Sequence, residues 1–307
     1  MLARNKACVY VTGSFGRCEA SAHSDLDLFI VGKRDGLRGP DGKEGSALKR
    51  LDEICIKADL IEATRALDFP EFSGDGRYLT HYSVHDFTKT LGTPHDDATN
   101  TLTARLLLLL ESRPLLEHSI YDEVIEEVVA AYSRDYEDHK NDFIPAFLTN
   151  DILRLWRTFC VNYEARTERV PEKEKAKGKL KNYKLKHSRL LTCYSGILYL
   201  VAIYSRDQTV TPKQIVSMTG LTPTERLEWL LEEDHVTDAH GELRGLLDRY
   251  QEFLQTTNAG EQDLIERFSD KEEARALMQQ AAEFGDFMFE ALTRIGKGDK
   301  FHRLLVV

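Results

Sequence analysis

The chain has 307 residues, of which 42% are hydrophobic and 30% are charged, and its formal net charge is −10. This composition is typical of a folded globular protein, and the length leaves room for two ordinary domains. The acidic balance argues against broad coating by nucleic acid, although a local basic patch can still hold a phosphate group.

The five cysteines are scattered along the chain and include no CxxC pair. This pattern argues against a disulfide framework or a zinc site, and it favours a reducing, cytoplasmic location. The first ten residues lack a basic stretch followed by an apolar one, so we expect no signal peptide. With tyrosine counted as polar, the longest uninterrupted apolar run, residues 106–110, is too short to span a bilayer, and we expect no membrane role.

Two short segments near the start are predicted to form strands. Residues 7–12 (ACVYVT) are β-branched and aromatic, and Gly13 with Ser14 then breaks the run and offers a helix start. Residues 25–31 (DLDLFIV) alternate acidic and apolar side chains before they become fully apolar. This period-2 pattern predicts a second strand on which Asp25 and Asp27 point to the same face.

The remaining elements follow in chain order. Residues 33–43 have the Gly, Pro, Asp and Lys composition of an exposed loop, and residues 46–67 show helical spacing. Residues 78–84 are a plausible third strand, and from residue 100 onward the pattern is almost entirely helical. We therefore expect an α+β fold, with a small domain of strands and helices followed by a helical domain.

The two aspartates and the preceding bend form a candidate site. Two carboxylates two residues apart on a strand repel each other, and a divalent metal relieves that repulsion. Magnesium takes one or two protein carboxylates together with substrate phosphates, which assigns Asp25 and Asp27 as candidate ligands. Gly13 lets the backbone approach a phosphate, Ser14 and nearby amides offer donors, and Arg17 adds positive charge. A lone GS or a lone DLD commonly has no function, so the hypothesis depends on their joint occurrence.

These residues carry a resemblance to a known family. The motif of Gly13-Ser14, Arg17 and residues 24–27 (SDLD) resembles the signature of the nucleotidyltransferase superfamily. That superfamily includes DNA polymerase beta, protein-PII uridylyltransferase and the oligoadenylate-type synthases.

Later segments resemble a narrower group within the superfamily. Residues 96–112, 147–164 and 182–196 are similar to a bacterial group related to the uridylyltransferase-like domain, and the resemblance covers roughly residues 1–205. It implies a mixed-sheet nucleotidyltransferase domain at residues 1–98 and a helical substrate- or nucleotide-binding domain at residues 99–307.

The resemblance also implies an activity. A nucleoside monophosphate would move from an NTP to an acceptor while pyrophosphate leaves, with two Mg²⁺ ions, or Mn²⁺ in their place, on Asp25 and Asp27. The acceptor stays open between a protein side chain, a tRNA end and another nucleotide.

The sequence departs from the family pattern at the third carboxylate, which a later strand normally supplies. Residues 78–84 contain no acid, whereas Glu71, Asp75 and Asp86 lie near that segment. Asp75 is the candidate catalytic residue, but its place between two glycines also suits an ordinary turn. If none of them serves, the alternative is an inactive nucleotide-binding regulator or a toxin–antitoxin component. A third alternative is an oligonucleotide second-messenger synthase of phage defence.

A basic segment lies in the predicted helical part. Residues 172–189 hold eight Lys or Arg residues and two Glu, and much of this run suits a solvated helix face. Lys184, Lys186 and Ser188 lie beside an apolar helix, and they look similar to the lysine and serine with which related transferases hold the triphosphate. An RNA backbone groove is the alternative use of the segment.

Three further features have ordinary explanations. Asp151, Arg154 and Arg157 lie on one side of a predicted helix, where they form salt bridges or contact a base or acceptor. Asn100 is expected to cap a helix and Arg105 to pair with an acid.

Residues 211–231 have the pattern of a helix, a tight turn and a second helix. Because glutamates on the second helix would repel phosphates, we interpret this segment as a structural hairpin and consider DNA an unlikely partner.

Overall fold

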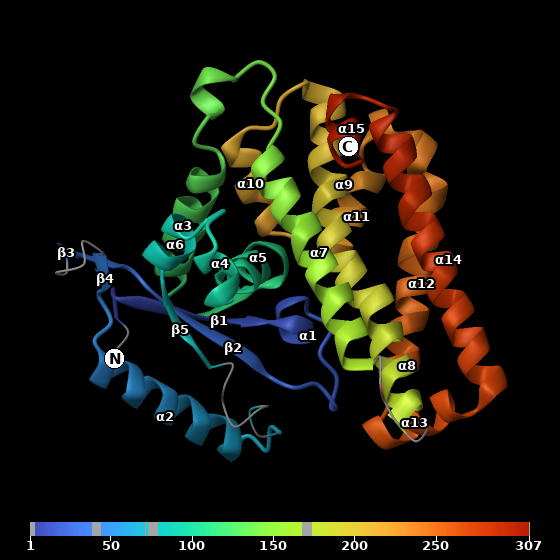
Figure 1. Ribbon diagram of the computed structural model, residues 1–307, viewed down its shortest axis with the longest axis horizontal. Helices are drawn as coiled ribbons and strands as arrows, with labels where there is room; N and C mark the ends of the chain where they lie inside the picture. Colours follow the sequence, from blue (N-terminus) through green and yellow to red (C-terminus); the bar gives the residue numbers. More distant parts are fainter. Residues whose placement is uncertain (1–3, 39–43, 71, 73–78, 168–173, 307) are drawn as a thin grey trace. The chain divides into compact units, whose positions relative to one another are not determined.

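The computed structural model describes residues 4–38, 44–70, 72, 79–167 and 174–306 (Figure 1). The chain divides into two compact units, Met1–Arg134 and Asp135–Val307. Elements beyond residue 98 belong to the sheet and core of the first unit.

The first unit is built around a mixed four-stranded sheet in the order β5-β2-β1-β6. Strand β1 is antiparallel to both β2 and β6, and β5 is parallel to β2. The strands are β1 (Ala7–Thr12), β2 (Asp27–Gly32), β5 (His81–Ser83) and β6 (Arg113–Leu116). The β1 and β2 segments are the two strands that the sequence predicts first.

One face of this sheet packs against helix α2 (Arg50–Ala66). Val9 and Ile30 are register partners on the two central strands, and both are fully buried with Ile56 of α2 in one apolar cluster. Paired residues of antiparallel strands share a face, so β-branched side chains of both strands reach the same core.

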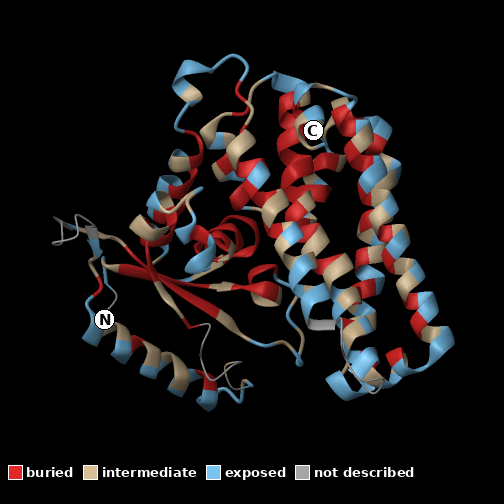
Figure 2. Ribbon diagram, in the orientation of Figure 1, coloured by how far each residue is buried: buried red, intermediate tan, exposed pale blue. Residues whose placement is uncertain are grey.

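The other face holds aromatic side chains and helices α5 (Thr101–Glu111) and α6 (His118–Tyr132). Tyr10 stacks on Phe29 with ring centroids 5.6 Å apart and meets Tyr121 of α6 edge to face at 6.0 Å. Figure 2 shows the central strands buried along most of their length. A sheet covered on both faces explains why its central strands are so apolar.

The expected loop at residues 33–43 was wrong in part. Strands β3 (Arg34–Arg38) and β4 (Glu44–Ser46) form an antiparallel two-stranded ribbon. Backbone hydrogen bonds hold the two strands together. A polar composition therefore predicts that the segment is exposed, but it does not exclude the pairing of the two strands.

Strand β6 was missed, since a nearly all-helical pattern was expected from residue 100 onward. Pro114 in this strand pairs with Tyr10, and β6 is an edge strand of the sheet. Proline has no N–H to donate and is tolerated at an edge, although it lowers any strand prediction from the sequence.

Two strand boundaries also differ from the expectation. Strand β2 begins at Asp27, so Asp25 lies before it, and β5 is shorter than the predicted strand at residues 78–84. Helix α3 (Val84–Lys89) begins directly after Ser83, whose side chain forms a capping box with Asp86. This cap ends the strand because it commits the backbone to a helical turn.

Two short helices complete the first unit. They are α1 (Gly13–Gly16), which follows β1, and α4 (His95–Ala98), which precedes α5.

The described part of the second unit contains helices and no strand, as the apolar periodicity predicts. Its long central helix α9 is buried along most of its length and contacts α7, α11 and α14. The α-helices are α7 (Ala146–Thr167), α8 (Lys175–Lys184), α9 (Leu190–Asp207), α10 (Pro212–Thr219), α11 (Pro223–Leu231), α12 (His240–Thr257), α13 (Glu261–Ser269), α14 (Lys271–Gly296) and α15 (Lys300–Leu304).

A π-helical segment, Leu185–Arg189, joins α8 to α9. Helices α10 and α11 are the two helices predicted within residues 211–231, and each begins with a threonine capping box and a proline in its first turn. Across the described residues, no helix combines the length and the hydropathy needed to cross a membrane.

Candidate functional site

The bend between β1 and α1 brings Asp27 to Gly13. Asp27 is the register partner of Thr12, the residue just before the bend. Gly13 adopts a left-handed conformation with a φ of +65°, and a Cβ placed on it would lie 3.2 Å from Oδ2 of Asp27. Glycine therefore suits this position for two reasons. The left-handed conformation is strained for other residues, and a side chain here would come close to the Asp27 carboxylate.

Ser14 and Asp25 are more accessible than Gly13. Ser14 is half-buried in α1, and Asp25 is exposed and precedes β2. Strand alternation therefore does not fix the direction of the Asp25 side chain. That it shares a face with Asp27 stays a prediction.

Arg17 is held by two carboxylates of its own unit. The side chain is 7% exposed and donates from Nη1 to Oε2 of Glu111 at 2.6 Å and from Nε to Oε2 of Glu19 at 2.8 Å. A Cβ at Gly16 would overlap the backbone carbonyl of Glu111, so α1 approaches the end of α5 closely. These contacts anchor the bend, and a direct contact between Arg17 and a phosphate stays a prediction.

The third carboxylate is not located. Asp75 and Glu71 lie outside the described residues. Asp86 accepts hydrogen bonds at 2.8 Å from both the backbone N–H and the hydroxyl of Ser83, which commits it to the cap of α3. Asp75 therefore stays the candidate.

The donor set of the bend fits magnesium in kind. Within the described ranges, no three His, Cys, Asp or Glu residues gather in a group that could hold a metal. Asp25 and Asp27 together provide hard oxygen donors, and magnesium commonly uses one or two carboxylates and completes its shell with water and phosphate.

Lys184, Lys186 and Ser188 lie in the second unit. Lys184 ends α8 and is exposed, whereas Lys186 is half-buried and Ser188 buried in the π-helical segment. Local π-helical geometry is frequent at functional sites, because it turns side chains out of the regular helical order. A joint contact of these three side chains with a triphosphate stays a prediction.

His187 in the same segment is buried. Its Nδ1 lies 2.9 Å from the carbonyl oxygen of Tyr183, and its ring stacks on Phe253 at 4.8 Å. Burial lowers the pKa of His187 to about 4, with a smaller contribution in the same direction from the charge of Lys186 and an opposing one from the hydrogen bond to the Tyr183 carbonyl. His187 is thus a neutral core residue near pH 7.

Arg105 pairs with an acid, as expected. It forms two hydrogen bonds of 2.9 and 2.8 Å with Asp96, and both side chains are fully buried. Asn100 occupies the N-cap position of α5, as expected, but it has a φ of 58° and its side chain makes no capping hydrogen bond. Asparagine tolerates the left-handed region, which serves the turn that precedes α5.

Three residues that the sequence did not single out form a hydrogen-bonded cluster. His81 Nε2 lies 3.0 Å from Oγ of Ser46, and His81 Nδ1 lies 3.0 Å from Oε2 of Glu53. A Cβ at Gly32 would overlap the Ser46 hydroxyl, so the backbone of β2 covers it. Burial raises the pKa of Glu53, but hydrogen bonds from Lys57 and His81 outweigh it and the net direction is downward.

This cluster joins β4, β5 and α2. Its members are far apart in the sequence, and no spacing rule could have found them. The covered hydroxyl indicates a structural tie between the three elements.

Comparison with known protein families, with curated proteins and with solved structures finds no match for this chain. The assignment of the bend to a nucleotidyltransferase therefore depends on its own residues.

Proposed function

We propose that the chain is a magnesium-dependent nucleotidyltransferase, which moves a nucleoside monophosphate from an NTP to an acceptor with release of pyrophosphate. The observation that carries this proposal is the approach of the Asp27 carboxylate to the left-handed Gly13. The carboxylate can bind a cation, and the glycine bend can bind a phosphate beside it. Phosphoryl transfer requires a cation and a phosphate to be adjacent in this way.

Each residue of the bend has a role in this proposal. Asp25 and Asp27 hold the metal, which would supply positive charge to the phosphates and to the attacking oxygen. Gly13 lets the backbone come close to the phosphate chain, and Ser14 donates a hydrogen bond to it. Arg17 supports the bend through its ion pairs with Glu19 and Glu111. Asp75 would orient the acceptor hydroxyl.

The second unit would contribute cations to the triphosphate. Lys184 and Lys186 act as point charges on phosphate oxygens, and Ser188 adds a hydroxyl donor. The exposure of Lys184 at the end of α8 supports this role, because an exposed ammonium is available to a ligand.

The test is pyrophosphate release with each labelled NTP and Mg²⁺, alone, with tRNA and with cell lysate. Replacement of the metal-binding carboxylate in Asp27→Asn is expected to lower release by about a hundredfold or more. Asp59→Asn is the matched control, because Asp59 is an exposed aspartate on α2. Electron paramagnetic resonance measures the binding of Mn²⁺. Binding is expected to weaken in Asp25→Asn and in Asp27→Asn, and to stay unchanged in the control Asp59→Asn.

The other outcomes separate the alternatives. NTP binding without pyrophosphate release under any condition would replace the enzyme with a nucleotide-binding regulator. A small-molecule product formed without an added macromolecule would identify an oligonucleotide synthase. Release that is equal in Asp27→Asn and in the unaltered chain would refute the assignment of the bend.

A further inference from the structure

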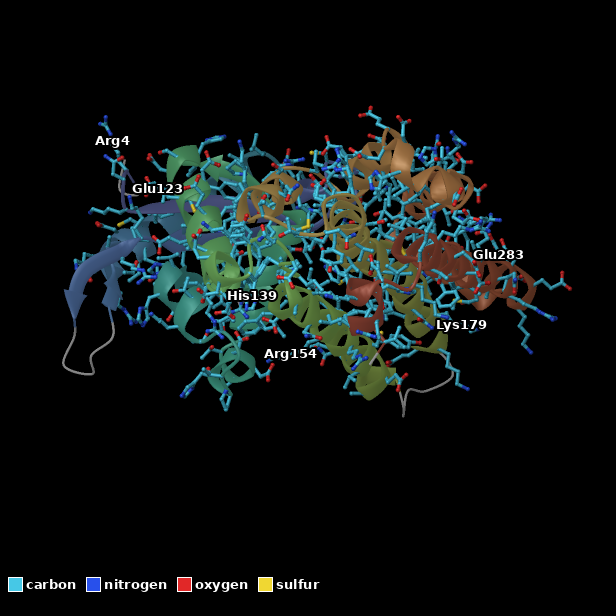
Figure 3. All side chains as sticks on the ribbon, turned by 90° about the horizontal axis from the view of Figure 1, so that it is seen from above. Arg4, Glu123, His139, Arg154, Lys179 and Glu283 are labelled. Carbon is cyan, nitrogen blue, oxygen red and sulfur yellow. The ribbon has the colours of Figure 1, made fainter. Side chains whose placement is uncertain are left out.

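Helix α8 carries a basic surface, which consists of the exposed side chains of Lys175, Lys177, Lys179, Lys181 and Lys184. The helix has ten residues, and none of them is acidic. Figure 3 labels Lys179 on this helix. In a chain with a formal net charge of −10, the basic surface is a local reversal of charge.

The packing of α8 does not require these lysines. The apolar side of the helix holds Ala176, Leu180 and Tyr183, which are buried. The ring of Tyr183 lies 5.5 Å from the ring of Phe253 and 5.5 Å from that of Phe268, measured between centroids. These contacts attach α8 to its unit, so the core does not explain the number of exposed lysines.

The positions of the lysines are unfavourable for the helix by itself. Lys175 and Lys179 are four residues apart, as are Lys177 and Lys181, and like charges at this spacing repel each other. The first turn contains no acid, and cations there also oppose the positive end of the helix dipole. A bound polyanion would relieve both kinds of repulsion.

Internal acids neutralise only part of this charge. Lys177 forms an ion pair of 2.7 Å with Glu261 of α13. The hydrogen bond from Lys177 lowers the pKa of Glu261, and the charges of Lys184 and Lys181 act in the same direction. Lys179, Lys181 and Lys184 form no ion pair with any residue that the structure describes. Their ammonium groups are therefore available to an anion from solution.

The chemistry of the surface suits the backbone of a nucleic-acid duplex. Lysines bind phosphates as point charges, and contacts to phosphates carry no sequence information. Proteins that bind single strands commonly stack the bases on aromatic side chains, whereas Tyr183, the aromatic residue of α8, is fully buried. A duplex stacks its own bases and presents a dense row of phosphates, so it needs only cations from its partner.

We propose that the basic surface of α8 binds the phosphate backbone of an RNA duplex. The choice of RNA rests on the proposed function, because the tRNA end is the one acceptor open to that reaction that carries a long phosphate backbone. The contact with phosphates rests on α8 alone and does not require the reaction to occur.

Fluorescence anisotropy of a labelled RNA duplex tests the proposal, with the full chain and without Mg²⁺ or NTP. We expect saturable binding at about 50 mM salt, and a slope of about −3 for the logarithm of the association constant against that of the salt concentration. Single-stranded RNA of the same sequence is expected to bind more weakly and with a shallower slope, because its charge density is lower.

A double variant locates the binding. Lys179→Gln combined with Lys181→Gln removes two cations that the proposed function does not use. It is expected to weaken the RNA duplex about tenfold and to make the salt slope shallower by about two. Lys213→Gln combined with Lys271→Gln is the matched control, because it removes the same charge from exposed lysines on α10 and α14. Circular dichroism of each variant verifies that its helices are retained.

A third variant separates this surface from the proposed active site. Asp27→Asn is expected to abolish pyrophosphate release and to leave the affinity for the RNA duplex unchanged. RNA binding without pyrophosphate release under any condition would therefore refute the transferase and support the surface. Pyrophosphate release without RNA binding would refute the surface and support the transferase.

Three further results would overturn the proposal. One is an affinity that Lys179→Gln with Lys181→Gln lowers no more than the matched control does. The second is tighter binding of single-stranded RNA, or of a DNA duplex of the same sequence, than of the RNA duplex. The third is displacement of the RNA by poly-L-glutamate at an equal concentration of charge, because an acidic protein would then suit the surface equally well.

Discussion

Gly13 links backbone conformation to the position of a carboxylate. Replacement by alanine is strained at a φ of +65°, and the new Cβ would lie 3.2 Å from Oδ2 of Asp27. We expect Gly13→Ala to lower the free energy of unfolding by about 1–2 kcal/mol from the left-handed conformation, with a further loss from the displaced carboxylate. Urea denaturation measures both.

Gly36 provides the control for this prediction. It has a φ of +71°, and a Cβ on it would meet nothing within 4 Å. Gly36→Ala should therefore cost the conformational strain alone. If both variants lose the same stability, the Asp27 carboxylate does not lie against Gly13.

The ion pair of Asp96 and Arg105 ties helix α4 to helix α5 inside the first unit. Both side chains are fully buried, so Asp96→Asn would leave the guanidinium without its counter-charge. We expect a loss of about 3–5 kcal/mol in the free energy of unfolding, because desolvation of an uncompensated charge is costly. Urea denaturation of Asp96→Asn measures the loss.

A double variant distinguishes the charge from the packing. Asp96→Leu with Arg105→Met removes both charges, and this pair should lose less stability than Asp96→Asn alone. If the double variant is less stable than Asp96→Asn, the pair of Asp96 and Arg105 contributes more to stability than the neutralisation of two buried charges.

The π-helical element between α8 and α9 makes stability depend on pH through His187. Burial lowers the pKa of His187 to about 4, below the ordinary value of 6.5 that the unfolded chain restores. The unfolded state therefore binds more protons between these values. The stabilisation is complete above about pH 6.5 and is lost as the pH falls toward 4, by about 3 kcal/mol.

His187→Gln tests this linkage, because glutamine does not titrate. The variant is less stable at pH 7 if the ring contacts are lost, but its stability should fall less steeply between pH 6.5 and 4 than that of the unaltered chain. Urea midpoints across this range give both slopes. Parallel slopes would show that another group causes the pH dependence.

Across the whole molecule, periodicity predicts the elements whose side chains alternate between core and solvent. The strand at residues 7–12 and the two helices within residues 211–231 are found where the pattern places them. Strand β6 was not predicted, because Pro114 argues against a strand unless the edge position is known. Edge positions depend on the complete sheet, which local patterns do not contain.

The candidate site was predictable only where its parts are close in sequence. Asp27 approaches Gly13 because β1 and β2 are consecutive antiparallel strands, in which Thr12 pairs with Asp27. The partner Glu111 of Arg17 lies 94 residues away, so this ion pair could not be foreseen. The cluster of Ser46, His81 and Glu53 was hidden for the same reason.

The division into two units makes a prediction about folding. The unit Asp135–Val307 has its own core around α9. Because a segment with a separate core can fold alone, we expect residues 135–307 to unfold cooperatively without the first unit.

Circular dichroism of the fragment during thermal unfolding measures this prediction. A fragment without a cooperative transition would mean that the helical core depends on residues 1–134, because its own buried surface does not offset the loss of chain entropy.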